Sequence, residues 1–130
     1  MPISVFARRD QRKHKAVTMG ATPTGPARED LAKTLDAIER LNPRLNAVLT
    51  VTANEAQAAA ADGAKANGES LGPLHGLPVI VKDCLPVSGV RSTFGNRAHE
   101  HRIADFDAEI IKRLKAAGAV IAGMSNLSEF

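Results

Sequence analysis

Apolar residues recur at helical spacing in the segment that follows residue 23. They lie three or four positions apart, as on the buried face of a surface helix, at Leu31, Leu35, Ile38 and Leu41. Pro26 suits the first turn of a helix, because its missing N–H would have no partner there. Asn42-Pro43 indicates the end, since a proline disfavours helical backbone in the residue before it. We therefore expect a first helix from about residue 24 to Asn42.

Capping patterns predict two further helices. Thr52 and Glu55 have the spacing of a capping box, in which each side chain bonds the other residue's backbone N–H. An alanine-rich run continues from there to Asn67-Gly68. Asp107 is placed to cap a third helix, which Gly118 would end. The inward face of that helix is expected to consist of Ala108, Ile111, Leu114 and the stem of Lys115.

Three short segments between these helices predict strands. They are residues 46–51, 79–81 and 119–122. The last two are unbroken apolar runs, which are typical of strands covered on both faces. Helices and strands alternate along the chain, so we expect an α/β fold with a mixed, mostly parallel sheet flanked by helices.

A long irregular segment follows the second strand. Residues 84–104 have little periodicity and contain turn-forming proline and glycine. Loops of this length in compact domains usually have a function. Ligands of open α/β sheets collect beyond the carboxyl ends of the strands. Lys82 stands at such an end, and so do Met124, Ser125 and Asn126.

The composition indicates a globular domain preceded by a basic tail. The 130 residues are 44% hydrophobic and 24% charged, whereas only 3% are aromatic. Residues 1–20 hold five basic side chains against one acidic one, and the other 110 residues hold 12 against 13. We expect residues 1–23 to be a disordered basic tail and residues 24–130 to be the folded part. The scarcity of aromatic side chains counts against nucleic-acid binding by base stacking.

Cys84 is the only cysteine of the chain, so no internal disulfide can form. A single free thiol suits a reducing compartment. No apolar run approaches the roughly 18 residues that would span a membrane. The first residues also lack the order of basic and apolar segments found in signal peptides. We expect a cytoplasmic protein with no membrane partner and no nucleic-acid partner.

Lys82 raises a chemical question, because it places a charge at the end of an apolar strand. Removing an ammonium group from water is costly unless the charge is paired or used. A desolvated strand end would lower the pKa of a lysine, because burial disfavours the charged form. The structural alternative is a lysine paired with Asp83 or with the carboxyl end of a helix.

Residues 72–83 carry the most specific pattern of the chain, Gly-Pro-Leu-His-Gly-Leu-Pro-Val-Ile-Val-Lys-Asp. The pattern continues in order with Gly89, Thr93, Gly95, Asp107-Ala108, residues 114–123, Asn126 and Glu129-Phe130. In this order and spacing it resembles the amidase signature family over about residues 26–130. The resemblance implies that residues 24–130 form a partial amidase domain, the N-terminal part of the amidase signature fold.

The resemblance also implies amide hydrolysis through a Ser–cis-Ser–Lys triad, with no metal or other cofactor. Lys82 matches the catalytic lysine, whose implied role is to take the proton of the bridging serine, which in turn activates the nucleophilic serine. The family's glycine- and serine-rich segment, which supplies both serines and the oxyanion donors, is not among these 130 residues. The serines that are present lie in no glycine-rich elbow: Ser4, Ser70, Ser88, Ser92, Ser125 and Ser128.

We therefore expect the N-terminal fragment of an amidase-family hydrolase, carrying only the lysine of the triad and inactive alone. Its substrate would be a small-molecule amide, bound once the missing C-terminal part completes the site. The alternative is a non-catalytic truncated remnant or a partner-dependent interaction module. Such a chain is expected to self-associate through uncovered apolar surface. A third class, a module that binds nucleic acid through its basic tail, has no recognition motif to support it.

The other reactive side chains have structural interpretations. Cys84 has no helix N-terminus or assigned histidine beside it, which predicts a buried or half-buried thiol. His75, in the turn before the second strand, is expected to be structural or to lie at the rim of a pocket. Four residues of metal-ligating type stand close together at a spacing that matches no zinc motif: His99, His101, Asp105 and Asp107. We expect no metal site there.

Overall fold

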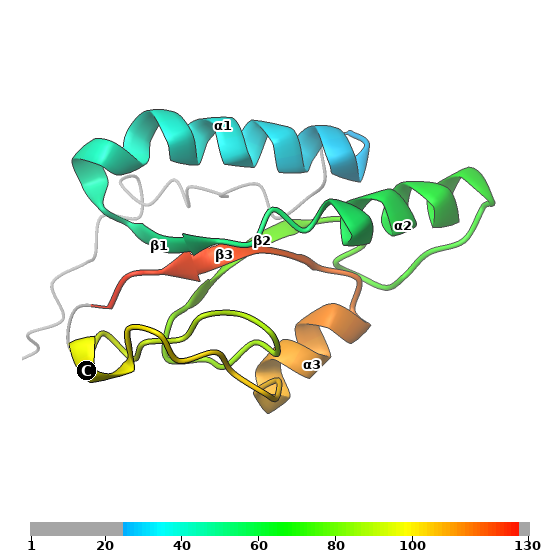
Figure 1. Ribbon diagram of the computed structural model, residues 1–130. Coiled ribbons are helices and arrows are strands. Elements are labelled where there is room, and N and C mark those ends of the chain that lie inside the picture. The colour runs from blue at the N-terminus through cyan, green and yellow to red at the C-terminus, as the bar shows by residue number, and fades with distance from the viewer. Residues whose placement is uncertain (1–24, 128–130) are drawn as a thin grey trace, which may run out of the picture.

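The computed structural model describes residues 25–127 (Figure 1). In chain order the elements are α1 (Ala27–Leu45), β1 (Val48–Val51), α2 (Glu55–Ala66), β2 (Pro78–Lys82), the 3-10 turn η1 (Arg97–His99), α3 (Glu109–Ala116) and β3 (Val120–Ser125). The predicted alternation of helices and strands is confirmed. The predicted basic tail, residues 1–23, lies outside the described residues. None of the helices within residues 25–127 has the length and apolarity of a membrane span.

The three strands form one mixed sheet in the order β1-β3-β2. The central strand β3 pairs in parallel with β2 and antiparallel with β1. The predicted mixed sheet flanked by helices is confirmed. The expected majority of parallel pairs is not found among the described strands, where one pair is parallel and one is antiparallel. Each pairing shifts register once, between Val48 and Thr50 and between Val79 and Ile80.

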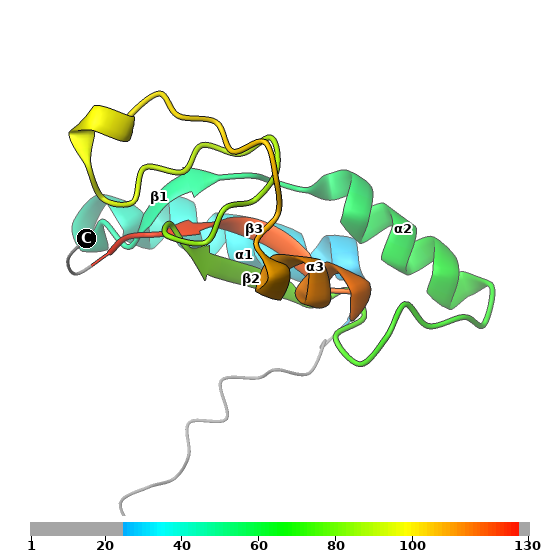
Figure 2. The same cartoon turned by 90° about the horizontal axis from the view of Figure 1, so that it is seen from below.

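Two apolar cores lie on opposite faces of this sheet. Helices α1 and α2 cover one face, whereas α3 and the loop of residues 84–104 lie on the other (Figures 1 and 2). The core under α1 and α2 consists of Ala27, Leu31, Ala58, Ala61, Val120 and Ala122. The core on the α3 side consists of Val81, Val87, Ile111, Ile121 and Met124. β3 contributes to both cores, as its unbroken apolar sequence predicts.

The end of α1 differs from the sequence prediction. The helix continues to Leu45, past the expected end at Asn42. Pro43 falls in the last turn, where its missing N–H costs only one helical hydrogen bond. The side chain of Asn42 meanwhile fixes the start of β1, because its Nδ2 donates to the Val48 carbonyl at 2.8 Å and its Oδ1 accepts from the Val48 N–H at 2.9 Å. The chain leaves the helix at Asn46, whose φ of 48° is left-handed, a conformation common at helix C-termini.

The start of α1 is capped by another helix. The carboxylate of Asp62 in α2 accepts hydrogen bonds from the backbone N–H groups of Ala27, at 2.6 Å, and Arg28, at 3.1 Å. These are donors that have no partner inside the helix, and a negative charge at this end is also favoured by the helix dipole. Asp62 therefore joins the two helices through the N-terminus of α1.

Two predicted N-caps are wrong. The Thr52 hydroxyl donates to the carbonyl of Ile121 in β3, and α2 begins only at Glu55, with no side-chain cap. The Asp107 carboxylate accepts from the Ser88 N–H and from Lys115, and α3 begins after Ala108. In both cases a tertiary partner takes the side chain that could have bonded the local N–H groups.

The loop of residues 84–104 folds back on itself as an antiparallel pair of chains. Arg91 and Ile103 form an isolated bridge. The Gly89 N–H donates to the Ala104 carbonyl at 2.8 Å, and the Ala104 N–H donates to the Val90 carbonyl at 3.0 Å. This long segment therefore has a defined hydrogen-bonded backbone, and it places η1 beyond the carboxyl end of β3 (Figure 2).

Candidate functional site

Lys82 is the last residue of β2 and lies at the carboxyl end of the strand. In the sheet register it is opposite Ser125 of β3, and Ser125 is opposite Val48 of β1. The three residues form a row across one end of the sheet. The prediction that Lys82 and the segment around Ser125 both stand at the carboxyl ends of strands is confirmed, and the two strands are neighbours.

The expected burial of Lys82 is wrong for the described part of the chain. Its side chain is exposed, whereas the preceding Val81 is only 4% exposed. Successive side chains of a strand point to opposite faces, so Lys82 points away from the core that receives Val81. The alternative of a pair with Asp83 is also wrong, because no ion pair of Lys82 occurs within residues 25–127 and the Asp83 carboxylate bonds elsewhere.

Asp83 anchors the long loop beside Lys82. Its carboxylate is fully buried and accepts hydrogen bonds from the backbone N–H of Thr93, at 3.0 Å to Oδ2, and from the Thr93 hydroxyl. The buried Ser92 hydroxyl donates to the Asp83 carbonyl at 2.9 Å, and the Asp83 N–H donates to the Ser125 carbonyl at 3.1 Å. One residue thus connects β2, β3 and the loop at the end of the sheet.

The tip of this loop packs an arginine onto a ring. The guanidinium carbon of Arg102 lies 5.0 Å from the centre of the Phe94 ring, and the His99 ring meets Phe94 edge-on at 6.1 Å between ring centres. Among the described residues, Nη1 of Arg102 is buried without a hydrogen-bond partner. The ring face compensates part of that cost, because it attracts the cation.

A pocket of about 310 Å³, here called the sheet-end pocket, lies between β1, the end of β3 and the loop. It is lined by Asn46, Leu49, Arg91, Thr93, Gly95, Asn96, Arg97, Glu100 and Asn126. Two lining residues are connected to residues beside Lys82. Thr93 donates a hydrogen bond to Asp83, the residue after Lys82, and Asn126 directly follows Ser125, the residue opposite Lys82 in the sheet. Sequence reasoning missed this pocket, since its residues come from three separate segments, 46–49, 91–100 and 126. The two arginines in a loop beyond a strand end were the only available signal.

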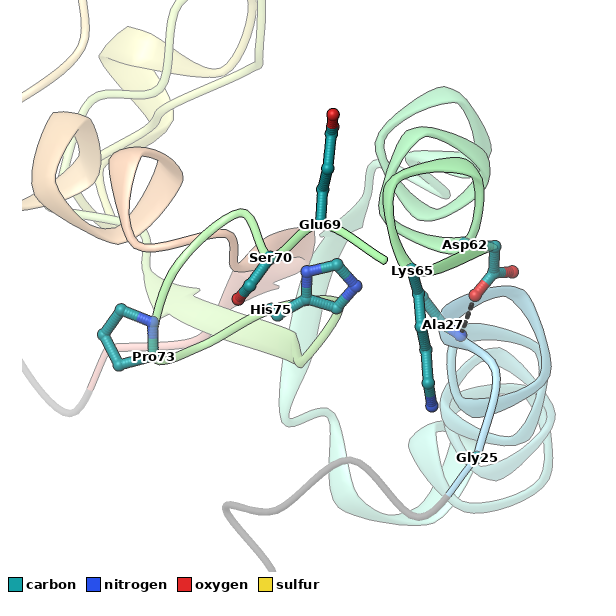
Figure 3. A pocket seen from close by; sticks show the side chains of 8 residues that line it. All are labelled: Gly25, Ala27, Asp62, Lys65, Glu69, Ser70, Pro73 and His75. Atoms are coloured by element: carbon teal, nitrogen blue, oxygen red, sulfur yellow. Dashed lines mark hydrogen bonds between the residues drawn. The ribbon is translucent and has the colours of Figure 1, made fainter. Parts of the chain in front are cut away.

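A second pocket of about 350 Å³ lies at the opposite end of β2 (Figure 3). It is enclosed by the start of α1, by α2 and by the turn that precedes β2, and Figure 3 shows Lys65 and His75 facing it. The His75 Nδ1 accepts the Leu71 N–H at 2.9 Å. Because Nδ1 accepts, the neutral ring carries its proton on Nε2. The sequence left a structural role and a place at the rim of a pocket as alternatives for His75, and the residue combines a bond within its own turn with a place in the pocket lining.

The remaining candidate side chains do not assemble into a reactive cluster. Cys84 is half-buried and free, as predicted. His99, His101 and Asp105 are exposed. Within residues 25–127, no group of three or more histidine, cysteine, aspartate or glutamate side chains is arranged to hold a metal ion.

Asp107 holds α3 against the loop. Its carboxylate accepts from Lys115 Nζ at 2.8 Å and from the Ser88 N–H at 2.8 Å. Burial of the carboxyl tends to raise its pKa, but the Lys115 hydrogen bond, the Ser88 N–H and the positive charges of Lys115 and Lys112 outweigh this effect. The pKa of Asp107 is therefore lower than its ordinary value.

Comparison with known proteins gives a consistent result. The sequence model of the Amidase family matches residues 29–130. The chain belongs to the amidase family. A glutamyl-tRNA(Gln) amidotransferase subunit of Moorella thermoacetica is 44% identical over 104 residues, which cover 78% of this chain and 21% of that protein. The chain thus spans about a fifth of the length of such relatives.

Solved structures of the amidase family show the same arrangement. A chain from a vestigial protein complex related to the origin of an s-triazine catabolic enzyme superposes with a TM-score of 0.76 at 36% identity, covering 81% of this chain and 24% of that one. A bacterial aryl acylamidase of the amidase signature family superposes with a TM-score of 0.71 at 31% identity, covering 78% and 22%. The predicted family and the partial amidase fold are confirmed.

Proposed function

We propose that this chain supplies the lysine of an amide-hydrolysing site, with Lys82 as its proton-accepting base. The observation that carries the proposal is the place of Lys82, at the carboxyl end of β2 in a sheet shared with amidases. Active-site residues of open α/β sheets gather at that end. Buried bonds of Asp83 hold the adjoining loop beside it.

The proposed chemistry needs two serines that this chain does not supply in the required setting. A neutral Lys82 amine would take the proton of a bridging serine, which would take the proton of the nucleophilic serine. The nucleophilic oxygen would then attack the amide carbonyl, and ammonia or an amine would leave with a proton. Because Lys82 is exposed within the described residues, the desolvation that favours its neutral form must come from the segment that brings the serines.

The test is fragment complementation. The 130-residue chain is mixed with the part of the Moorella thermoacetica amidotransferase subunit that follows the matched region, and release of ammonia or amine from a panel of simple amides is measured. The chain alone is expected to be inactive, and the mixture is expected to be active. Lys82→Ala should lower the mixture's activity by about 100-fold or more, the usual contribution of a general base. Lys65→Ala, which removes another exposed lysine, should leave it unchanged.

Two results would contradict the proposal. One is full activity of the mixture after Lys82→Ala. The other is the absence of turnover from a mixture that elutes as one stable complex. Turnover by the 130-residue chain alone, abolished by Lys82→Ala, would keep the role of the lysine but contradict the need for a second chain.

The alternative function is a partner-dependent interaction module without chemistry. Apolar side chains favour it, because Leu45 is 64% exposed and Leu41 is 40% exposed. They line a groove of about 410 Å³ between α1 and the start of β1, together with Ile38 and Val48. Exposed apolar patches often mark interfaces. Sedimentation analysis decides: self-association that Leu45→Lys abolishes supports this alternative, and a monomer at high concentration contradicts it.

A further inference from the structure

The sheet-end pocket presents mainly hydrogen-bond donors. The Asn96 Oδ1 accepts the Ala98 N–H at 2.8 Å, and the Asn126 Oδ1 accepts the Leu127 N–H at 2.8 Å. Both side-chain oxygens are therefore already bonded to the backbone. The Asn126 Nδ2 also donates to the Asn46 carbonyl at 3.0 Å. What remains for a ligand is one N–H of Asn126 and the NH₂ group of Asn96, and these groups can only donate.

Two arginines add positive charge to the same pocket. Arg91 is held in place, because its Nη1 donates to the Glu100 carbonyl at 3.1 Å and its Nε lies 3.4 Å from the Thr50 hydroxyl. A guanidinium group has five N–H donors, so most of those on Arg91 remain free for another acceptor. Arg97 is exposed at the rim. Glu100 is the one acidic residue of the lining, which leaves an excess of one positive charge.

We propose that the sheet-end pocket binds the oxyanion group of a small molecule, a carboxylate or a phosphate. Guanidinium forks match the oxygen geometry of both groups, and charge-assisted bonds of this kind are short and strong. The volume of about 310 Å³ lies at the lower end of the range of small-molecule sites. This site is separate from the proposed chemistry of Lys82 and does not require it.

The experiment follows the backbone amide resonances of the isotope-labelled 130-residue chain by NMR at constant ionic strength. Succinate, inorganic phosphate and neutral succinamide are titrated in turn. We expect saturable shifts confined to residues that line the pocket, produced by succinate or phosphate and not by succinamide. Whichever anion binds more tightly identifies the group.

Three variants locate the site. Arg97→Gln should weaken anion binding about tenfold, because one charge-assisted bond is lost. Glu100→Gln should strengthen binding about two- to fivefold, since a repelling charge is removed. Lys112→Ala, which removes an exposed lysine on α3 away from the pocket, should change nothing. Arg97 and Glu100 are exposed, so these changes are expected to leave the fold intact.

The proposal is overturned if neither anion gives saturable shifts at the pocket, or if succinamide gives the same shifts. It is also overturned if Arg97→Gln leaves the affinity unchanged, or if Arg113→Gln, a change to an exposed arginine on α3 paired with Glu109, weakens binding equally. The last result would show that the affinity for the anion depends only on the net charge of the protein and not on the pocket.

Discussion

Thr93 donates both its backbone N–H and its hydroxyl to the buried carboxylate of Asp83. Asp83 follows Lys82 directly, and its backbone also bonds Ser92 and Ser125. The position of the long loop relative to the end of β2 therefore depends on one carboxylate. Asp83 has no role in the proposed proton transfer, but its hydrogen bonds fix the position of the loop next to Lys82.

Asp83→Ala should destabilise the protein by about 3 kcal/mol, because two buried donors of Thr93 lose a charged acceptor. Thr93→Val keeps the N–H bond and should cost less, about 1 to 1.5 kcal/mol. Urea unfolding followed by circular dichroism measures both changes. Asp105→Ala, an exposed aspartate in the same loop, should change the free energy by less than about 0.5 kcal/mol. Equal effects of Asp83→Ala and Asp105→Ala would contradict this account.

The Asp107–Lys115 pair should make stability depend on pH. The folded-state pKa of Asp107 is lowered, so its contribution is complete above the unfolded value of about 3.9 and is lost as the pH falls through the folded value. Asp107→Asn should cost about 1 kcal/mol at pH 7, and its stability curve should meet that of the wild type in strong acid. Unfolding free energies measured from neutral to acidic pH test this.

The matched control for this pH effect is Glu109→Gln. Glu109 pairs with Arg113 at 3.0 Å, but both side chains are largely exposed, and such surface pairs contribute little. Its curve should run parallel to the wild type. A difference between Asp107→Asn and wild type that stays constant down to strong acid would rule out the charge of Asp107 as the cause.

A comparison of Gly76 and Gly89 separates the cost of backbone strain from the cost of a steric clash when a side chain is added. Their φ angles are nearly equal, 71° and 77°, so an alanine at either position is strained by about 1 to 2 kcal/mol. A Cβ on Gly76 would lie 2.7 Å from the Cβ of Ala27, whereas one on Gly89 would meet nothing within 4 Å. Gly76→Ala should therefore be more destabilising than Gly89→Ala by about 1 to 3 kcal/mol, the cost of overpacking. Equal losses in thermal unfolding would contradict the close approach of α1 to this turn.

Lys82→Met should leave stability nearly unchanged, within about 0.5 kcal/mol, because the side chain is exposed and makes no ion pair within residues 25–127. Lys115→Met removes a paired, mostly buried ammonium and should cost about 1 kcal/mol. Chemical denaturation compares the two variants. A large loss for Lys82→Met would indicate that this lysine is a structural residue.

The sequence predicted which helices and strands form better than it predicted the side-chain contacts at the starts of the helices. Apolar spacing located the first helix, and unbroken apolar runs located β2 and β3, because burial of these side chains decides where such elements form. The caps at Thr52 and Asp107 were wrong, since Ile121 and Lys115, outside the local turn, bind those side chains. The place of Lys82 at the end of a strand followed from the pattern. Its exposure did not, because exposure depends on which segments cover that end of the sheet.

The position of β3 has a consequence for how the molecule is made. Among the strands of residues 25–127, β1 and β2 each pair with β3 and with no other, and β3 follows them both in the chain. During synthesis, β1 and β2 leave the ribosome with no strand between them, and no ladder of this sheet can close until residues 120–125 follow. Helices α1 and α2, joined through Asp62, can pack earlier. Until β3 is synthesised, β1 and β2 lack the strand that joins them, and unpaired apolar strands of this kind are exposed to misassembly.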